Sequence, residues 1–303
     1  MSLQSYSFSF KAMACRNELS LYAKNRKTAK AIADDAISIV NTLESRYSRY
    51  LPDSLLSTIN RSAGNPSGVV VDNETTALLD YAQTCYQQSG GLFDVTSGVL
   101  RSIWNFKENR LPSQHQIDTT LELIGWEKVR WAAPHITLPV AGMELDFGGV
   151  VKEYAADACA NLCRSHGIHH GMVNMGGDIH VIGPHPDGTA WKIGIQDPSD
   201  PAKTITTVNL KRGGLASSGD YQRFIEIDGQ RYSHILNPKT GWPVQGLRAV
   251  SVIAPHCLIA GSTSTIAMLK GEAGKQWLDE TLVPYLWVDD ESHLFTHTNQ
   301  VSK

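Results

Sequence analysis

The stretch that decides the fold is GLASSGDYQRFIEIDGQRYSHILNPKTGWP, residues 214–243. Two runs rich in apolar residues flank the dipeptide Asp228-Gly229. This dipeptide between alternating strands is a strong signal of a two-residue β-hairpin, because both turn positions need a positive φ. The turn fixes the register and places His234 opposite Arg223. A histidine that faces an arginine on a ribbon, with hydroxyl groups nearby, indicates a site for an anion.

Helices and runs of neighbouring strands are expected in the rest of the chain. Apolar residues at helical spacing predict helices over 26–47, 74–88, 150–165, 258–270 and 275–281. Strands are expected within 5–23, 143–147, 170–183, 190–198, 205–219, 249–255, 283–290 and 293–297, with a glycine-marked turn at 217–220. The stretch 101–139 is mixed and resists assignment.

The order of these elements predicts the fold class. Because strands come in adjacent runs and not in strict βαβ alternation, we expect an α+β fold with largely antiparallel sheets and packed helices. No internal repeat, low-complexity tract or linker divides the sequence. We therefore expect residues 1–303 to form one continuous domain with two lobes.

The composition excludes several classes of protein. The 27 basic and 30 acidic residues give a slight negative charge, and no basic run points to nucleic acid as a partner. No apolar stretch is long enough to span a membrane. The five cysteines lack a Cys-x-x-Cys spacing, so we expect reduced thiols in a reducing compartment. A cytoplasmic location is expected, and a periplasmic one is the alternative if a leader has been removed.

A second anion-binding signal lies near the middle of the chain. A short strand, Gly148-Gly149 and the start of a helix follow one another, which aims backbone N–H groups at a common point. Lys152 falls in the first turn of this helix, where a cation opposes the helix dipole and costs stability unless an anion lies beside it. A solvated surface lysine is the alternative interpretation.

Six segments in sequence order resemble the ApbE family of FAD:protein FMN transferases, over about residues 10 to 290. They are ESRYSRYLPDSLLSTIN (44–60), GGLFDVTSG (90–98), DFGGVVKEYAADA (146–158), VNMGGDI (173–179), the segment 214–243 quoted above, and AGSTSTIAMLKG (260–271). The resemblance implies an ApbE-like, T-fold-like architecture. It also implies that FMN moves from FAD to a threonine or serine hydroxyl of an acceptor flavoprotein, with release of AMP and assistance from Mg²⁺.

The resemblance also assigns residues to the site. His234 is the expected general base, because a histidine can accept a hydroxyl proton near neutral pH. A strand histidine satisfied by a backbone carbonyl is the alternative. The implied FAD-binding residues are Met13, Tyr50, Leu92, Phe93, Asp94, Lys152, Ala158 and Ile235. The implied metal ligands are the backbone carbonyl of Ala155 and Thr265.

Several of these residues also have structural interpretations. Met13 and Tyr50 lie among apolar neighbours and would suit a core. Phe93 and Asp94 match a buried ring beside a capping carboxylate. The glycine loop at 174–178 fits close approach of a ligand, and a plain β-turn explains it almost as well.

Gly261 departs from the family pattern. The resemblance implies an aspartate there, four residues before Thr265, so that both oxygens share one helix face and hold Mg²⁺. Glu153 departs too, at a position where many relatives carry glycine. We therefore expect the flavin site to persist with a lower magnesium affinity. In one alternative Mg²⁺ still binds through Ala155, Thr265, the phosphates and another carboxylate such as Asp146 or Asp178; in the other, Lys152 and Arg223 do much of the neutralising.

Two alternatives to the transferase remain open at this stage. One is an FAD pyrophosphohydrolase, in which water replaces the protein hydroxyl. The other is an FAD-binding protein that does not turn FAD over, which Gly261 favours.

Overall fold

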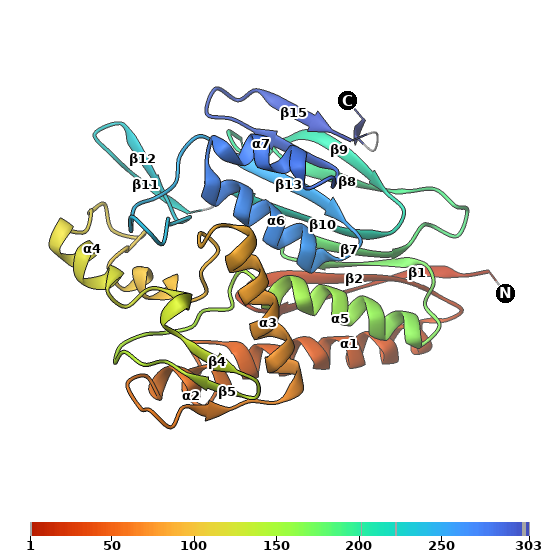
Figure 1. Cartoon of the computed structure of the whole chain (residues 1–303). Coiled ribbons are helices and arrows are strands. Elements are labelled where there is room, and N and C mark those ends of the chain that lie inside the picture. The colour runs from red at the N-terminus through yellow and green to blue at the C-terminus, as the bar shows by residue number, and fades with distance from the viewer. Residues whose placement is uncertain (1, 201, 222, 299–300, 303) are drawn as a thin grey trace.

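The computed structural model of the chain describes residues 2–200, 202–221, 223–298 and 301–302. An eight-stranded sheet with the order β1-β2-β6-β7-β10-β13-β14-β15 forms its centre (Figure 1). Every neighbouring pair in this sheet is antiparallel, which confirms the expected α+β fold. The strands are β1 (Gln4–Ala12), β2 (Cys15–Ala23), β6 (Gly171–Met175), β7 (Asp178–Gly183), β10 (Gly213–Gly219), β13 (Ala249–Ala254), β14 (Tyr285–Val288) and β15 (Leu294–His297).

Helices cover one face of the sheet, and a small sheet covers the other (Figure 1). Helix α1 packs on β1 and β2, α5 on β6 and β7, and α6 on β10 and β13, while α7 rests on α6. The small sheet, β16-β9-β8, buries a separate apolar cluster against the opposite face. These elements are α1 (Arg26–Tyr47), α5 (Val151–Ser165), α6 (Cys257–Lys270), α7 (Ala273–Glu280), β8 (Trp191–Gln196), β9 (Thr204–Leu210) and β16 (Val301–Ser302).

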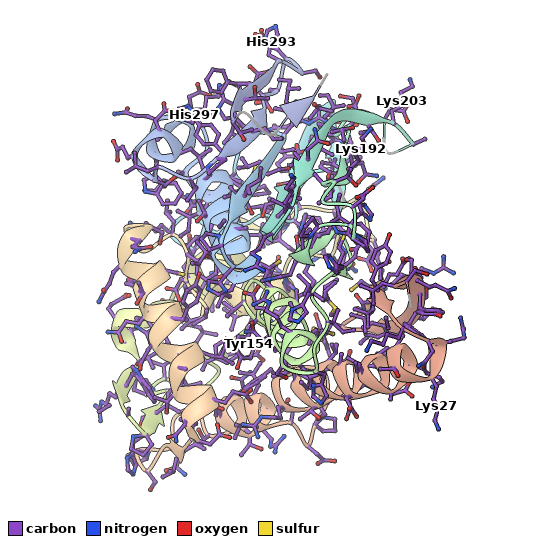
Figure 2. The ribbon with its side chains drawn as sticks, turned by 90° about the vertical axis from the view of Figure 1, so that its right-hand side faces the viewer. Lys27, Tyr154, Lys192, Lys203, His293 and His297 are labelled. Carbon is purple, nitrogen blue, oxygen red and sulfur yellow. The ribbon has the colours of Figure 1, made fainter. Side chains whose placement is uncertain are left out.

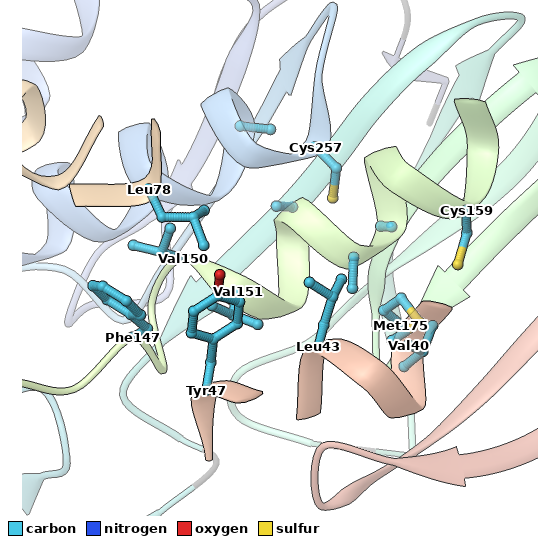
Figure 3. Close-up of a cluster of buried hydrophobic side chains, with 14 of the residues drawn as sticks. Val40, Leu43, Tyr47, Leu78, Phe147, Val150, Val151, Cys159, Met175 and Cys257 are labelled. Atoms are coloured by element: carbon cyan, nitrogen blue, oxygen red, sulfur yellow. The ribbon is translucent and has the colours of Figure 1, made fainter. Parts of the chain in front are cut away.

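The main core lies between the large sheet and the helices that cover it, and α1, α5 and α6 all contribute side chains (Figure 3). Helix α1 begins at Asn25, whose side chain accepts a hydrogen bond from the N–H of Thr28. Its apolar side chains recur every three or four residues and so face α5 and the sheet. At its end the ring of Tyr47 packs edge to face on Phe147, with 5.7 Å between ring centroids. This contact joins α1 to the segment that leads into α5.

The stretch that resisted assignment forms short elements beside the main sheet. They are η1 (Ser97–Ser102), α4 (Gln114–Leu121), η2 (Trp126–Lys128), β4 (Arg130–Ala132) and β5 (His135–Thr137). Strand β5 pairs with β3 (Val69–Val70) and β4, and α2 (Leu55–Arg61) and α3 (Asn73–Gln88) complete this part of the fold (Figure 1).

The predicted hairpin and its register are confirmed. Strands β11 (Phe224–Ile227) and β12 (Gln230–Ser233) pair around Asp228 and Gly229, whose φ values are +51° and +74°. Ile225 is buried in a third apolar cluster with Leu100 and Trp104 of the η1 region. The hairpin is therefore a two-stranded sheet of its own that rests on the η1 region.

Two smaller expectations are wrong. Residues 143–147 form no strand, because the side-chain amide of Asn60 takes both backbone bonds of Leu145, at 2.7 Å to its N–H and 3.0 Å to its carbonyl. The expected turn at 217–220 also fails: Ser217 and the two residues after it continue β10 and pair with β13.

Polar side chains such as Lys27, Lys192, Lys203 and His293 lie at the outside of the molecule (Figure 2). None of the helices in the described part of the chain is long and apolar enough to cross a membrane. The five cysteines are free thiols in the described part of the chain, and Cys85, Cys159, Cys163 and Cys257 are buried.

The carboxylate of Asp157 joins α5, α6 and β7. Its Oδ1 accepts hydrogen bonds from the N–H of Cys257 at 2.8 Å and from His180 Nδ1 at 2.5 Å. Its Oδ2 accepts from the N–H of Leu258 at 3.0 Å. Helix α6 has no side-chain cap of its own, so Asp157 supplies the cap from a neighbouring helix.

We expect Asp157→Ala to lower the free energy of unfolding by about 3 kcal/mol, because it leaves buried N–H donors without an acceptor. Urea denaturation measures this loss. Asp35→Ala, at an exposed position of α1, is the control and should change stability by less than about 0.5 kcal/mol. Equal effects of the two substitutions would contradict the capping role.

Candidate functional site

A cavity of about 250 Å³ lies where α5, α6, β10 and the base of the hairpin meet. Segments far apart in the sequence supply its walls, and the side chains at its centre are both charged and apolar. The lining residues are Leu92, Phe93, Asp94, Val95, Ser97, Gly98, Arg101, Asp146, Gly148, Gly149, Val150, Lys152, Glu153, Asp178, Ser217, Ser218, Gly219, His234, Ile235, Leu236, Thr265 and Leu269.

Most of the sequence-predicted site residues line this one cavity. They are Leu92, Phe93, Asp94, Lys152, His234, Ile235 and Thr265. The structure thus brings together the loop 92–94, the start of α5 and the hairpin, which the sequence predicted separately.

Four predicted residues do not line the cavity. Ala155 and Ala158 lie on α5, beyond the first turn that reaches it. Met13 lies in the β1–β2 turn with a φ of +53°, and its N–H donates to Glu44 Oε1 at 2.7 Å. Tyr50 is 76% exposed and is therefore not a core residue. Their roles toward a ligand stay predictions.

Lys152 is paired with a buried carboxylate. Its Nζ lies 2.5 Å from Asp178 Oδ2, and the two side chains are 30% and 4% exposed. Burial alone would lower the pKa of Lys152, but the charges of Asp178 and Glu153 outweigh it and raise this pKa. The lysine is therefore a permanent cation in the cavity wall, and not the solvated surface residue of the alternative interpretation.

Asp94 organises the loop in which it lies. Its Oδ1 accepts from the N–H and hydroxyl of Thr96, at 2.8 and 2.7 Å, and its Oδ2 accepts from the N–H of Trp126 at 3.0 Å. Burial raises the pKa of Asp94, although these bonds oppose the rise. The capping interpretation of Asp94 therefore fits its geometry, and the same loop also presents Phe93 to the cavity.

His234 reaches the cavity from the end of the hairpin. Its backbone N–H bonds the carbonyl of Arg223 at 3.0 Å, and its Nδ1 lies 3.2 Å from the same carbonyl. Because a carbonyl only accepts, Nδ1 carries the proton and Nε2 holds a free lone pair. Burial, reinforced by the positive charges of Arg101 and Arg223, lowers the pKa of His234 to about 4. The imidazole is therefore neutral at physiological pH.

Sequence reasoning missed a second cation, Arg101. Its Nη1 lies 3.6 Å from Asp146 Oδ2, which also meets Arg49 Nη1 at 3.3 Å. Arg101 falls at the start of the stretch that resisted assignment, so only its charge could have drawn attention to it. The expected cation, Arg223, is exposed and is not among the lining residues.

The glycine loop between β6 and β7 is a plain turn. Gly176 has a φ of +62°, and a Cβ there would lie 2.9 Å from the Cys15 side chain. The N–H of Gly177 donates to Asn174 Oδ1 at 2.8 Å. Only Asp178, at the end of the turn, reaches the cavity.

The oxygen atoms of the cavity include one carboxylate oxygen without a partner. Glu153 is 7% exposed, and its Oε2 makes no hydrogen bond to any residue that the structure describes. Thr265 Oγ1 lies 3.0 Å from Ser218 Oγ on the wall formed by α6 and β10. Within the described ranges, no three His, Cys, Asp or Glu side chains converge on one point as metal ligands. A cation here would need hydroxyl, carbonyl or phosphate oxygens as well.

We expect Lys152→Met to lower the free energy of unfolding by about 2 kcal/mol, because it strands the buried charge of Asp178. Adding Asp178→Asn should recover much of this loss, since no unpaired charge then remains. Lys203→Met breaks an exposed pair with Asp200 and should cost about 0.5 kcal/mol or less. Thermal and urea unfolding measure the original chain and these three variants, and a double variant no more stable than Lys152→Met would contradict the pairing.

Comparisons with known proteins agree on one group. Residues 13–287 match the ApbE family. The FAD:protein FMN transferase of Treponema pallidum is 30% identical over 260 residues, which cover 80% of this chain and 72% of that protein. The enzyme of the same name from Chlamydia pneumoniae is 31% identical over 249 residues, 78% and 76% of the two chains. The crystal structure of the ApbE protein from Thermotoga maritima superposes with a TM-score of 0.87 at 28% identity and covers 97% of both chains.

Proposed function

The chain belongs to the ApbE family, and from that premise we infer that it is an FAD:protein FMN transferase. FAD is then its flavin donor, and a protein is its acceptor. One observation of the structure carries the proposal: a permanent cation, Lys152, and a neutral histidine, His234, line the same cavity. An enzyme that transfers a phosphoryl group needs both, a positive charge for the phosphates and a base for the attacking hydroxyl.

The diphosphate of FAD would lie at the start of α5. The N-cap residue Val150 makes no capping hydrogen bond with its side chain, although the N–H of Val151 already bonds the Phe147 carbonyl at 2.9 Å. The positive end of the helix dipole therefore still points at the cavity and favours an anion. Gly148 and Gly149 line the cavity just before it and let the backbone approach a ligand closely. Lys152 and Arg101 add two positive charges to the same wall. The apolar loop that carries Phe93 offers a surface for the flavin ring.

His234 would act as the general base toward the acceptor. We propose that its Nε2 takes the proton of a threonine or serine hydroxyl while that oxygen attacks the phosphorus on the FMN side of the diphosphate. A new P–O bond forms to the acceptor, the P–O bond to AMP breaks, and AMP leaves with the electron pair. The Nδ1–H bond to the Arg223 carbonyl holds the ring in the correct tautomer.

We propose that Mg²⁺ assists this reaction. The unpartnered, buried Oε2 of Glu153 and the hydroxyls of Thr265 and Ser218 form an oxygen-rich wall, which fits a hard divalent cation. The backbone carbonyl of Ala155 and the Thr265 hydroxyl are the ligands that the family resemblance implies. When bound, the cation neutralises charge on the diphosphate.

Product analysis tests the proposed function. The purified protein is incubated with FAD, MgCl₂ and a protein extract of the cells that carry its gene. We expect AMP by chromatography and a flavin-fluorescent protein band that survives denaturing electrophoresis. AMP with free FMN and no such band would establish a hydrolase instead, and intact FAD would establish a binding protein.

We expect His234→Asn to reduce AMP release by at least about 100-fold, because it removes the base. Affinity for FAD, measured by quenching of flavin fluorescence, should change little, since the diphosphate contacts remain. His166→Asn, on the exposed surface at the end of α5, is the matched control and should keep full activity. A parallel loss of FAD affinity in His234→Asn would assign the histidine to binding.

The pH profile should carry the signature of this base. Because burial lowers the pKa of His234 to about 4, the neutral form persists below the ordinary histidine value. The acidic limb of kcat/KM should therefore fall between about pH 4 and 5, and not near 6.5. Arg101→Gln removes a positive charge that lowers this pKa, so it should shift the limb to higher pH. A limb near pH 6.5 in both proteins would contradict this account.

A further inference from the structure

Gly261 lies inside α6, where a helix gains stability from almost any other residue. The reason for the glycine is its neighbour on α5. A Cβ at position 261 would lie 2.5 Å from Cγ of Glu153, 3.0 Å from its Cδ and 3.1 Å from its Oε1. The Glu153 side chain thus fills the space that any side chain at 261 would need.

The carboxylate of Glu153 differs from the other three that line the cavity. Asp94 accepts bonds from Thr96 and Trp126, Asp146 meets two arginines, and Asp178 is paired with Lys152. Glu153 is only 7% exposed and lies beside Asp178 and Lys152, and its Oε2 has no hydrogen-bond partner among the described residues. A buried, unpaired carboxylate is costly unless a cation or a proton joins it.

We propose that Glu153 supplies the anionic ligand for the divalent cation of this site, and that Gly261 is its steric complement. The family resemblance implies the reverse arrangement, a carboxylate on α6 and glycine on α5. In this chain the charge comes from the opposite helix and enters the same space. The inference rests on the proposed function, because the cation is the one that assists FMN transfer.

The surrounding atoms support this assignment. Glu153 and Thr265 face the same cavity from the two packed helices α5 and α6. Thr265 Oγ1 and Ser218 Oγ lie 3.0 Å apart, so hydroxyl oxygens stand on the wall beside the carboxylate. Lys152 is already engaged by Asp178 at 2.5 Å. The cavity therefore offers the Oε2 of Glu153 and several neutral oxygens to a hard cation, and such a cation would also offset the repulsion between the neighbouring carboxylates of Glu153 and Asp178.

The earlier expectation of a weakened magnesium site assumed that Gly261 leaves the site without a carboxylate. The structure places one there, from Glu153. A protonated Glu153 is the competing explanation for its burial. Glutamine has the shape of protonated glutamate and cannot bind a cation as an anion, so Glu153→Gln separates the two.

Mn²⁺ serves as the probe, since free Mn²⁺ gives an electron paramagnetic resonance signal that binding removes. The titration uses the full chain saturated with FAD. We expect Glu153→Gln to weaken Mn²⁺ binding at least tenfold without lowering the thermal midpoint. Unchanged Mn²⁺ affinity in Glu153→Gln would overturn the proposal.

Exchanging the two residues provides the decisive comparison. Glu153→Gly alone should lose Mn²⁺ binding at least tenfold, and Gly261→Asp alone should lower the thermal midpoint because its Cβ meets the Glu153 side chain. The double variant Glu153→Gly/Gly261→Asp should recover both the midpoint and the Mn²⁺ affinity to within about threefold of the original chain. A double variant that binds Mn²⁺ no better than Glu153→Gly would overturn the proposal.

Flavin fluorescence measured on the same samples separates this inference from the proposed function. If the original chain does not quench added FAD, the proposed function fails. If it binds and cleaves FAD while Glu153→Gln keeps its Mn²⁺ affinity, only the role of Glu153 fails.

Discussion

The carboxylate of Asp157 fixes how α5 and α6 lie against each other and against β7, and the site is built on that junction. One side chain accepts hydrogen bonds from two N–H groups of α6 and from His180 of β7. Glu153 lies one helical turn before Asp157, and Gly261 lies one turn after Cys257. The close approach of Glu153 to Gly261 follows from the same packing, because the hydrogen bonds of Asp157 join the two helices one turn from these residues.

The charged side chains of the cavity differ in whether a protein partner already binds them. Asp94 is held by its own loop, and Asp146 and Asp178 each meet a cation. Lys152 and Arg101 still face the cavity while they are paired, so an incoming anion can share them. Neutral His234 adds no charge to this balance. The cavity wall therefore suits an anionic ligand that binds together with a metal cation.

The sequence predicted the fold well where the pattern was local. Helix α1 and the hairpin followed from spacing and from Asp228-Gly229, and their ranges or register agree with the structure. The segment 143–147 did not, because a side chain distant in the sequence, Asn60, takes the backbone bonds that a strand would use. The pattern of apolar residues indicates which residues are buried. It does not show whether their backbone groups bond a neighbouring strand or, as here, a side chain.

The site was predictable in part for the same reason. The family segments located Lys152, His234 and Thr265, which do line one cavity. Arg101 was missed because it lies in a region without periodicity. Arg223 lies opposite His234 as the register predicted, but it is exposed and does not line the cavity. The relation of Glu153 to Gly261 spans more than 100 positions. Only the packing of two helices makes it visible.

The hairpin makes the position of the His234 imidazole depend on the number of residues in its turn. His234 follows β12 directly, and the two-residue turn at Asp228-Gly229 decides which residue meets Arg223. Side chains alternate between the two faces of a ribbon, so a single inserted or deleted residue at the tip exchanges those faces. The imidazole would then turn out of the cavity although no residue that lines it had changed. The orientation of His234 therefore depends on the length of the turn as well as on the residues that line the cavity.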